Sequence, residues 1–356
     1  MKHSFIMKHN FGAGPCILPQ EVFKQAAEAV IDFNGLSILE VSHRSADFVA
    51  VMEEARENVK KALNVPEGYT VLFLQGGASL GFLIAAYNMA GKHKRGAYIN
   101  TGEWSTKAIK EAKNAGVEPV IIASSEDKNF SYIPKGVEIP DDVDFVHYTS
   151  NNTIYGTQFK DIPATNKPLV CDMSSDIFSQ TIDVSKFDLI YAGAQKNLGP
   201  AGATLYIIKD SVLGKSSIEN IPTYLNLEVH AKKDSMFNTP PVFSVFVSNL
   251  NLKHLMKNGG VPAIQQLNEE KAAALYAEID SNSNFEGTTA VEDRSLMNVT
   301  FRLTDESKKE SFDKLWNDAG VVGLKGHRSV GGYRASIYNA LDISSIEVLV
   351  KAMQQL

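Results

Sequence analysis

Short runs of apolar and β-branched residues recur along the first two thirds of the chain, with helical periods between some of them. The runs cover residues 70–74, 97–100, 119–123, 144–149, 168–172, 188–192 and 203–208. Continuous apolar runs of this length are typical of strands that are buried on both faces of a sheet. The clearest helical pattern between them covers residues 103–115. Alternation of strands and helices predicts an α/β fold with a mostly parallel seven-stranded sheet, whose ligand-binding edge lies at the carboxyl ends of the strands.

The pattern changes after about residue 241, where helical periods predominate. Helices are predicted over 243–256, 263–279, 307–319 and 343–356, with strands over 295–303 and 333–338. A few strands with helices on one side predict a smaller C-terminal α+β domain. The Gly259-Gly260 pair suits a joint between the two parts. We therefore expect an N-terminal segment over residues 1–20, a large domain over 21–255 and a small domain over 256–356.

Composition excludes several classes of protein. The 356 residues carry 35 Lys and Arg against 41 Asp and Glu, a net charge of -6, which argues against a nucleic-acid coat or a polybasic membrane anchor. No apolar run approaches the ~18 residues that a spanning helix needs, and the N-terminus has no hydrophobic signal region. Cys16 and Cys171 form neither a metal-binding spacing nor a disulfide framework. We expect a reduced, cytoplasmic enzyme with no metal, nucleic-acid or membrane partner.

A glycine-rich motif, Gly76-Gly77-Ala78-Ser79, lies between the predicted strand 70–74 and the helix that follows it. Glycines let the backbone approach an anion, and the N-terminus of a helix offers free N–H groups, so the motif suits a phosphate group. A plain tight turn with Ser79 as the helix cap fits the same residues equally well. The motif alone therefore leaves both interpretations open.

Asp172 and Lys196 each follow another predicted strand. Asp172 is able to hold a protonated ring nitrogen, because a partly buried carboxylate stabilises a nearby cation, although a turn or cap role is commoner for such a residue. Lys196 follows small, uncharged residues, a setting in which a lysine can lose its proton and attack a carbonyl. A phosphate cradle, a ring-nitrogen aspartate and a Schiff-base lysine, in this chain order, predict a pyridoxal 5'-phosphate site.

Trp104 and Thr153 also lie just beyond predicted strands. An indole is able to stack on the flat cofactor ring, and a core or interface tryptophan is the alternative. A threonine hydroxyl is able to donate to the ring hydroxyl, and a role in a turn is the alternative.

Longer motifs in this chain are similar to those of a known enzyme family. They are FGAGP (11–15), EVSHR (40–44), YAGAQKN (191–197), SMFNTPP (235–241), KGHR (325–328) and GGYRASIYNA (331–340). On these motifs the chain resembles the phosphoserine aminotransferase family, which belongs to the class V group of fold-type I pyridoxal-phosphate enzymes. The motifs span residues 11–340, so the resemblance covers nearly the whole chain.

The resemblance implies a role for each candidate site residue. Lys196 would bind the cofactor as a Schiff base. Further cofactor contacts would come from Ala78, Ser79, Trp104, Thr153, Asp172, Gln195 and, from the neighbouring subunit, Asn238 and Thr239. Arg334 would clamp the substrate α-carboxylate. The substrate phosphate, or the distal carboxylate of glutamate, would be bound by His43 and Arg44 with His327 and Arg328 of the partner subunit.

Two positions depart from the pattern of some family members. Ser79 stands where some bacterial members carry an arginine that touches the substrate phosphate. Ala13 stands where some members carry a serine, so no side-chain hydrogen bond is expected there.

The resemblance also implies the reaction and the working unit. L-Glutamate would give its amino group to 3-phosphohydroxypyruvate in a ping-pong mechanism, in an obligatory homodimer with active sites at the subunit interface. Use of 4-phosphohydroxythreonine in pyridoxine biosynthesis, as in some bacterial relatives, stays open. The alternatives are an alanine–glyoxylate type aminotransferase, a desulfurase, and a non-catalytic nucleotide or phosphosugar binder. The five basic side chains available for a second anionic group favour the phosphorylated substrate.

Overall fold

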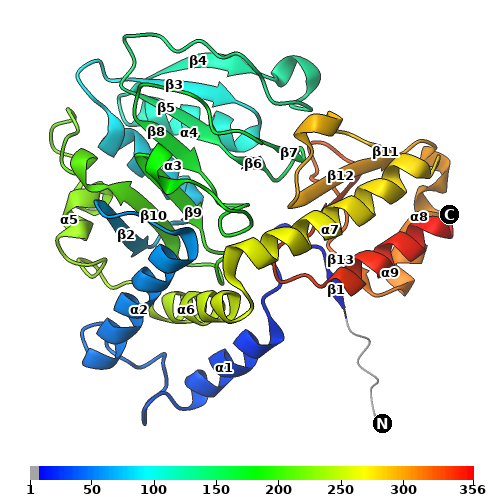
Figure 1. The fold of residues 1–356 in the computed structure, drawn as a ribbon, viewed down its shortest axis with the longest axis horizontal. Coiled ribbons are helices and arrows are strands. Elements are labelled where there is room, and N and C mark those ends of the chain that lie inside the picture. Colours follow the sequence, from blue (N-terminus) through cyan, green and yellow to red (C-terminus); the bar gives the residue numbers. More distant parts are fainter. Residues whose placement is uncertain (1–7) are drawn as a thin grey trace.

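The computed structural model describes residues 8–356. The first seven residues, which belong to the predicted N-terminal segment, lie outside the described residues. Figure 1 shows a large lobe built on one extended sheet and a smaller lobe that contains the last strands and the C-terminus. Helix α7 (Gly260–Ser281) starts beside the large lobe and extends into the small lobe.

The sheet of the large lobe is made of the seven strands that the apolar runs predict. In spatial order these are β2 (Tyr69–Leu74), β10 (Thr204–Lys209), β9 (Leu189–Gly193), β8 (Leu169–Asp172), β5 (Phe145–Thr149), β3 (Arg95–Asn100) and β4 (Glu118–Ser124). Strand β10 pairs antiparallel with β2 and β9, and the other neighbouring pairs are parallel. The predicted α/β class with a mostly parallel sheet is confirmed.

Helices cover both faces of this sheet, and strand β2 shows how the sequence requires this. Val71 and Phe73 belong to one apolar layer, whereas Leu72 and Leu74 belong to the other, because successive side chains of a strand point to opposite faces. The first layer contains α1 (Gln20–Ile31), α2 (Ala46–Leu63) and α6 (Val242–Lys257), and the second contains α3 (Gly77–Met89), α4 (Glu103–Asn114) and α5 (Leu227–Ala231). Burial on both faces explains the continuous apolar runs.

The small lobe contains a three-stranded antiparallel sheet and its own apolar core. Its elements, besides α7, are β11 (Phe285–Gly287), β12 (Asn298–Leu303), α8 (Lys309–Asp318), β14 (Tyr333–Ser336) and α9 (Ile343–Gln354). The predicted strand 295–303 begins only at Asn298, because the Ser295 hydroxyl accepts hydrogen bonds from the N–H groups of Met297 and Asn298, both at 2.9 Å, and forms a turn.

Two short strand pairings lie outside the two larger sheets. Strand β1 (His9–Asn10) pairs in parallel with β13 (Val321–Val322), so the described chain begins against the small lobe. Strands β6 (Asn151–Asn152) and β7 (Thr157–Gln158) form a hairpin beyond the end of β5. Gly259, with φ 94°, separates α6 from α7 at the predicted joint. The domain boundaries themselves stay a prediction.

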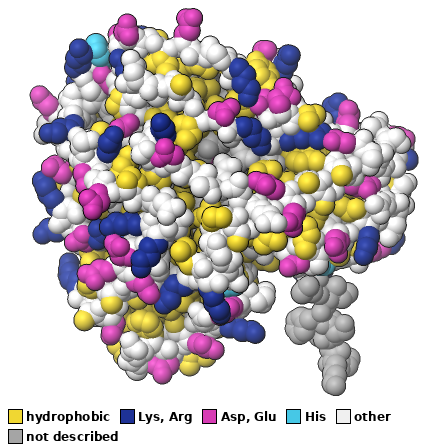
Figure 2. All heavy atoms as spheres, viewed as in Figure 1, with side chains coloured by type: hydrophobic (Ala, Val, Ile, Leu, Met, Phe, Trp, Pro, Cys, Tyr) yellow, Lys and Arg dark blue, Asp and Glu magenta, His cyan; other side chains and the backbone are white. Residues whose placement is uncertain are grey.

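The surface carries both signs of charge. Figure 2 shows Lys and Arg interspersed with Asp and Glu over one face of the molecule. Among the helices of residues 8–356, none is long and apolar enough to cross a lipid bilayer.

Candidate active site

The carboxyl ends of the parallel strands meet at one edge of the large sheet, and a cavity of about 200 Å³ lies there. Its wall includes every cofactor residue that the resemblance assigns within one chain, namely Ala78, Ser79, Trp104, Thr153, Asp172, Gln195 and Lys196. These residues come from five separate segments of the sequence. The topology brings them together because parallel strands place the segments that follow them at the same edge.

Lys196 lies on the turn that follows β9, and only 8% of it is exposed. Its Nζ donates to Thr153 Oγ1 at 2.6 Å and stands 5.8 Å from the centre of the Trp104 ring. Burial lowers the pKa of Lys196 to about 8, whereas the charge of Asp172 opposes this shift. A lowered pKa increases the fraction of neutral amine near neutral pH, and the neutral amine is the nucleophile that attacks a carbonyl.

Asp172 ends strand β8 and is almost fully buried. Its Oδ1 accepts hydrogen bonds from the backbone N–H and the hydroxyl of Ser174, at 2.9 and 2.6 Å. Burial raises the pKa of Asp172, and the two bonds from Ser174 and the charge of Lys196 oppose that rise. A buried carboxylate that is anchored in this way is suited to hold a cationic group beside it.

The glycine turn leads directly into α3. Gly76 and Gly77 have φ values of 106° and 65°, and a Cβ at Gly76 would lie 2.4 Å from Leu80 Cδ2. Gly76 is the residue that precedes the first helical turn, so Ser79 lies within that turn and does not cap the helix. The first N–H groups of a helix have no partner within the helix. The first N–H groups of α3, beside Gly77, Ala78 and Ser79, are therefore available to an anionic ligand in the cavity.

The cavity is also lined by four residues that the sequence did not single out for the site, namely Thr149, Asn151, Ser174 and Ser175. The Thr149 hydroxyl and the Trp104 indole N–H are buried without a hydrogen-bond partner, and buried polar atoms of this kind at a cavity wall suit a polar ligand. The residues present therefore fit pyridoxal phosphate. A sequence signal existed for Ser174, because an aspartate commonly accepts from the residue two positions later.

Arg334 lies on β14 of the small lobe and approaches the same cavity. Its Nη1 donates to the carbonyl oxygen of Thr153 at 3.4 Å. The segment after β1 passes across the Lys196 turn, where the Cys16 N–H donates to Gln195 O at 3.1 Å and the Cys16 thiol donates to Lys196 O at 2.6 Å. The cavity wall itself comes from the large lobe, and Arg334 of the small lobe and Cys16 of the N-terminal segment contact the backbone of two residues that line it.

Asn238 and Thr239 lie outside this cavity. Both are exposed, and they line a separate crevice beside Gln75, whose side-chain Nε2 donates to the Thr239 carbonyl at 2.8 Å. In one chain, these two residues are therefore not brought to Lys196.

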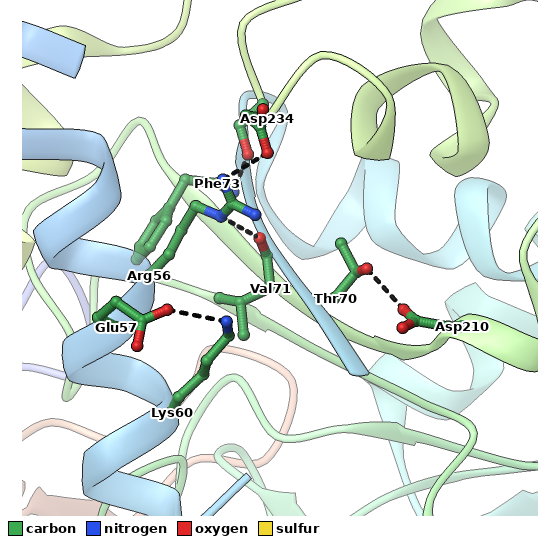
Figure 3. A network of polar contacts seen from close by, with 9 residues as sticks. Arg56, Glu57, Lys60, Thr70, Val71, Phe73, Asp210 and Asp234 are labelled. Carbon is green, nitrogen blue, oxygen red and sulfur yellow. Dashed lines mark hydrogen bonds and ion pairs between the residues drawn. The ribbon is translucent and has the colours of Figure 1, made fainter. Parts of the chain in front are cut away.

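The base of the segment that leads to Asn238 is fixed against strand β2, as Figure 3 shows. Arg56 donates to the Val71 carbonyl at 3.0 Å and pairs with Asp234 at 2.7 Å. The Ser235 hydroxyl accepts from the Phe73 N–H at 3.0 Å. Because β2 is an edge strand, these side chains occupy backbone groups that no neighbouring strand uses.

The four remaining candidates lie on two loops. His43 and Arg44 lie between α1 and α2, and His327 and Arg328 lie between β13 and β14. Burial lowers the pKa of His327, and the positive charges of Arg334 and Arg328 add to this effect. His327 therefore lies within the electrostatic field of the predicted carboxylate-binding arginine. None of the four lines the cavity of one chain.

A mostly parallel sheet with a buried lysine at the end of one strand and an anchored aspartate at the end of the next defines a pyridoxal-phosphate enzyme of fold type I. The profile of the family described as Aminotransferase class-V matches residues 8–349, and the chain belongs to this family.

Relatives and solved structures agree with this assignment. The chain is 58% identical over 352 residues to a protein named phosphoserine aminotransferase from Flavobacterium johnsoniae, with 98% of each chain covered. The phosphoserine aminotransferase structure from Bacillus circulans subsp. alkalophilus superposes with a TM-score of 0.94 at 43% identity, covering 98% of each chain. A structure described as PLP bound phosphoserine aminotransferase from Trichomonas vaginalis superposes at 0.93 with 35% identity, covering 98% of this chain and 100% of that one. The predicted family, fold type and pyridoxal-phosphate transaminase class are confirmed.

Proposed function

We propose that this aminotransferase transfers the amino group of L-glutamate to 3-phosphohydroxypyruvate, producing 2-oxoglutarate and O-phospho-L-serine. The observation that carries the proposal is a surplus of cationic side chains: Arg334 contacts the Thr153 segment of the cofactor cavity, whereas His327 and Arg328 lie on the loop between β13 and β14, outside the cavity of their own chain and available to the neighbouring subunit. One cation serves the α-carboxylate that all amino acids share, and the others serve a second anionic group. The names of the relatives, at 58% identity and below, support the same substrates.

The proposed roles come from the family resemblance, and the contacts of Lys196 and Asp172 at the cavity support them. Bound pyridoxal phosphate supplies an electron sink for the carbanion chemistry. Lys196 Nζ removes the proton from the substrate Cα and returns a proton later, as base and then acid. The Asp172 carboxylate keeps the proton on the cofactor ring nitrogen, and the Arg334 guanidinium binds the two oxygens of the α-carboxylate.

A comparison of acceptors tests the proposed substrate. With L-glutamate as donor, kcat/KM for 3-phosphohydroxypyruvate should exceed that for hydroxypyruvate by at least about a hundredfold, because a desolvated cationic site loses its partner when the phosphate is absent. Glyoxylate serves as the control for the alanine–glyoxylate alternative, and the phosphorylated hydroxythreonine substrate is assayed alongside. Equal values for phosphorylated and unphosphorylated acceptors would contradict the proposal.

We infer that the working unit is a homodimer in which Asn238 and Thr239 complete the cofactor site of the neighbouring subunit. Support comes from their position outside the cavity of their own chain and from apolar side chains that one chain leaves exposed. On and after α1, Ile31 is 83% exposed and Leu39 is 63% exposed, and Phe237 beside Asn238 is 39% exposed. A second copy of the chain would remove such a surface from water.

Hybrid dimers test this arrangement. Two variants are needed, Lys196→Ala and Asn238→Ala/Thr239→Ala, and each should be inactive or weakly active alone. When the two chains are co-expressed, the hybrid dimers should regain activity. The hybrid contains one complete site, in which Lys196 of one subunit meets the intact Asn238 and Thr239 of the other. Two Lys196→Ala chains mixed in the same way are the control. No gain of activity in the hybrid would exclude the shared site.

The pKa of Lys196 predicts how fast the cofactor-free enzyme binds its cofactor. Only the neutral amine attacks the aldehyde, so the rate constant for loading should rise about tenfold per pH unit below pH 8 and level off above it. Stopped-flow absorbance between pH 6 and 10 measures this rate. A profile that still rises between pH 9 and 10 would show an unperturbed lysine instead.

The two cysteines suggest a location. Cys16 and Cys171 are unpaired, and proteins of the reducing cytoplasm keep their thiols in this form. We therefore propose that the enzyme works in the cytoplasm.

A further inference from the structure

Lys271 of helix α7 is a buried lysine outside the cofactor cavity, with 2% of its surface exposed. Its Nζ donates to three backbone carbonyls, those of Ile337, Tyr338 and Leu341, at 3.0, 2.8 and 3.1 Å. An ammonium group has three N–H donors, so these carbonyls satisfy it completely. Burial lowers the pKa of Lys271 to about 7, whereas hydrogen bonds to three acceptors favour the charged form.

The turn formed by residues 337–341 connects the small lobe to the active site. It follows directly after β14, the strand that carries Arg334. The Asn339 N–H donates to the side-chain oxygen of Asn197, the residue next to Lys196, at 3.0 Å. The Tyr338 hydroxyl donates to the Ala13 carbonyl at 2.9 Å. The turn thus joins the predicted substrate clamp to the lysine loop and to the N-terminal segment.

A turn of this shape directs several carbonyl oxygens into the protein interior, where water does not reach them. Unpaired buried carbonyls are unfavourable, and a buried charge is unfavourable unless it is fully hydrogen-bonded. Lys271 and the turn therefore stabilise each other, and without the ammonium the turn is expected to shift.

We propose that Lys271 is a positioning residue for transamination, whose ammonium fixes the 337–341 turn and thereby sets the placement of Arg334 relative to Lys196. Lys271 does not reach the cofactor cavity, so it acts through the turn. A displacement of about 1 Å at a substrate-binding group lowers catalysis by as much as about a hundredfold.

A second cavity makes this inference testable by chemical rescue. The cavity, of about 370 Å³, is lined by Lys271, the 339–343 segment, Lys196 and Asn197, and by apolar and polar residues of α6, α7 and the N-terminal segment. Replacing Lys271 with alanine removes three methylene groups and the amine, the size of an n-propylammonium ion. The adjoining cavity gives such an ion space to reach the three carbonyls.

The experiment compares Lys271→Ala and Lys271→Met holoenzymes with the wild type. Lys271→Met keeps most of the side-chain volume and removes the charge. Leu275→Ala is the matched control, because Leu275 is fully buried one turn further along α7 and its loss leaves a cavity without removing a hydrogen bond. KM and kcat for L-glutamate, together with Tm, are measured with n-propylammonium chloride, with 1-propanol and with KCl. The wild type and Leu275→Ala in the same amine correct for its reaction with the cofactor.

In both Lys271 variants we expect KM for L-glutamate to rise about tenfold or more while kcat changes less, since carboxylate binding is affected first. In Lys271→Ala, n-propylammonium should raise Tm and lower KM, whereas 1-propanol should not. An unchanged KM in Lys271→Met, equal rescue by 1-propanol, or the same rise in KM in Leu275→Ala would overturn the proposal.

The kinetic measurement rests on the proposed substrate, whereas the thermal measurement does not. A wild-type enzyme that is inactive with L-glutamate would count against the proposed function alone. Rescue of Tm by the amine and not by the alcohol would still support the ammonium as the group that fixes the turn, and equal effects of both would still overturn it.

Discussion

Replacing Lys196 with alanine is expected to lower kcat/KM for transamination by at least about 10⁴-fold. The change removes both the nucleophile that binds the cofactor and the base at the substrate Cα. The fold should persist, because within residues 8–356 the Lys196 Nζ makes one hydrogen bond, to the Thr153 hydroxyl, so the alanine variant loses few stabilising contacts. Steady-state assays with L-glutamate and 3-phosphohydroxypyruvate measure the loss of activity, and thermal unfolding checks the fold.

Lys314→Ala is the control for this prediction. Lys314 lies on α8, is largely exposed and pairs with Asp318. The Lys314→Ala variant should therefore keep the activity of the wild type. Borohydride reduction, which fixes a lysine-bound cofactor, should label the wild type and the control but not Lys196→Ala. Substantial residual transamination by Lys196→Ala would remove the central assignment of the site.

Replacing Asp172 with asparagine is expected to lower kcat by about 10²- to 10³-fold. An amide has the shape of the carboxylate and its oxygen still accepts from Ser174, but it carries no charge to keep the proton on the cofactor ring nitrogen. Because the geometry is retained, the Tm should change much less than the activity. Single-turnover kinetics with L-glutamate, followed by cofactor absorbance, measure the step that depends on this proton.

Asp176→Asn is the matched control for Asp172→Asn. Asp176 is also buried, and its carboxylate accepts from Ser150 at 2.5 Å and from Gln158 at 3.3 Å, but it does not line the cofactor cavity. Loss of this charge should affect turnover much less. Equal losses in the two variants would show that buried negative charge in general, rather than a contact with the ring nitrogen, supports the reaction.

Local patterns were sufficient to predict the large sheet and the core of the site. The apolar runs around Val71 and Val170 identify strands because side chains are buried on both faces of the sheet. The carboxyl ends of parallel strands meet at one edge, so Asp172 and Lys196 could be placed near each other before their contacts were known. The roles of Arg334 and of the residues from the neighbouring subunit came from resemblance to a family and stay proposals.

Other features are not visible in the pattern of apolar residues along the chain. Ser174 supports Asp172 through a turn that the strand pattern does not predict, and strand β11 has only three residues, too few to show a period. Strand β10 shows the same apolar run as its neighbours although it runs antiparallel to them, because burial is independent of strand direction. Strand order and direction are therefore not visible in hydrophobicity.

The sequence by itself determined the α/β class, the seven strands of the large sheet and the chemistry available at their ends, because these follow from burial periodicity and from residue type. Only the tertiary structure decided which side chains share a cavity, that Asn238 and Thr239 lie apart from Lys196 in one chain, and that Lys271 is satisfied by three carbonyls 66 to 70 positions away. Such contacts arise when segments that are far apart in the sequence pack together in the folded chain, and no local pattern of residues encodes the distances between them.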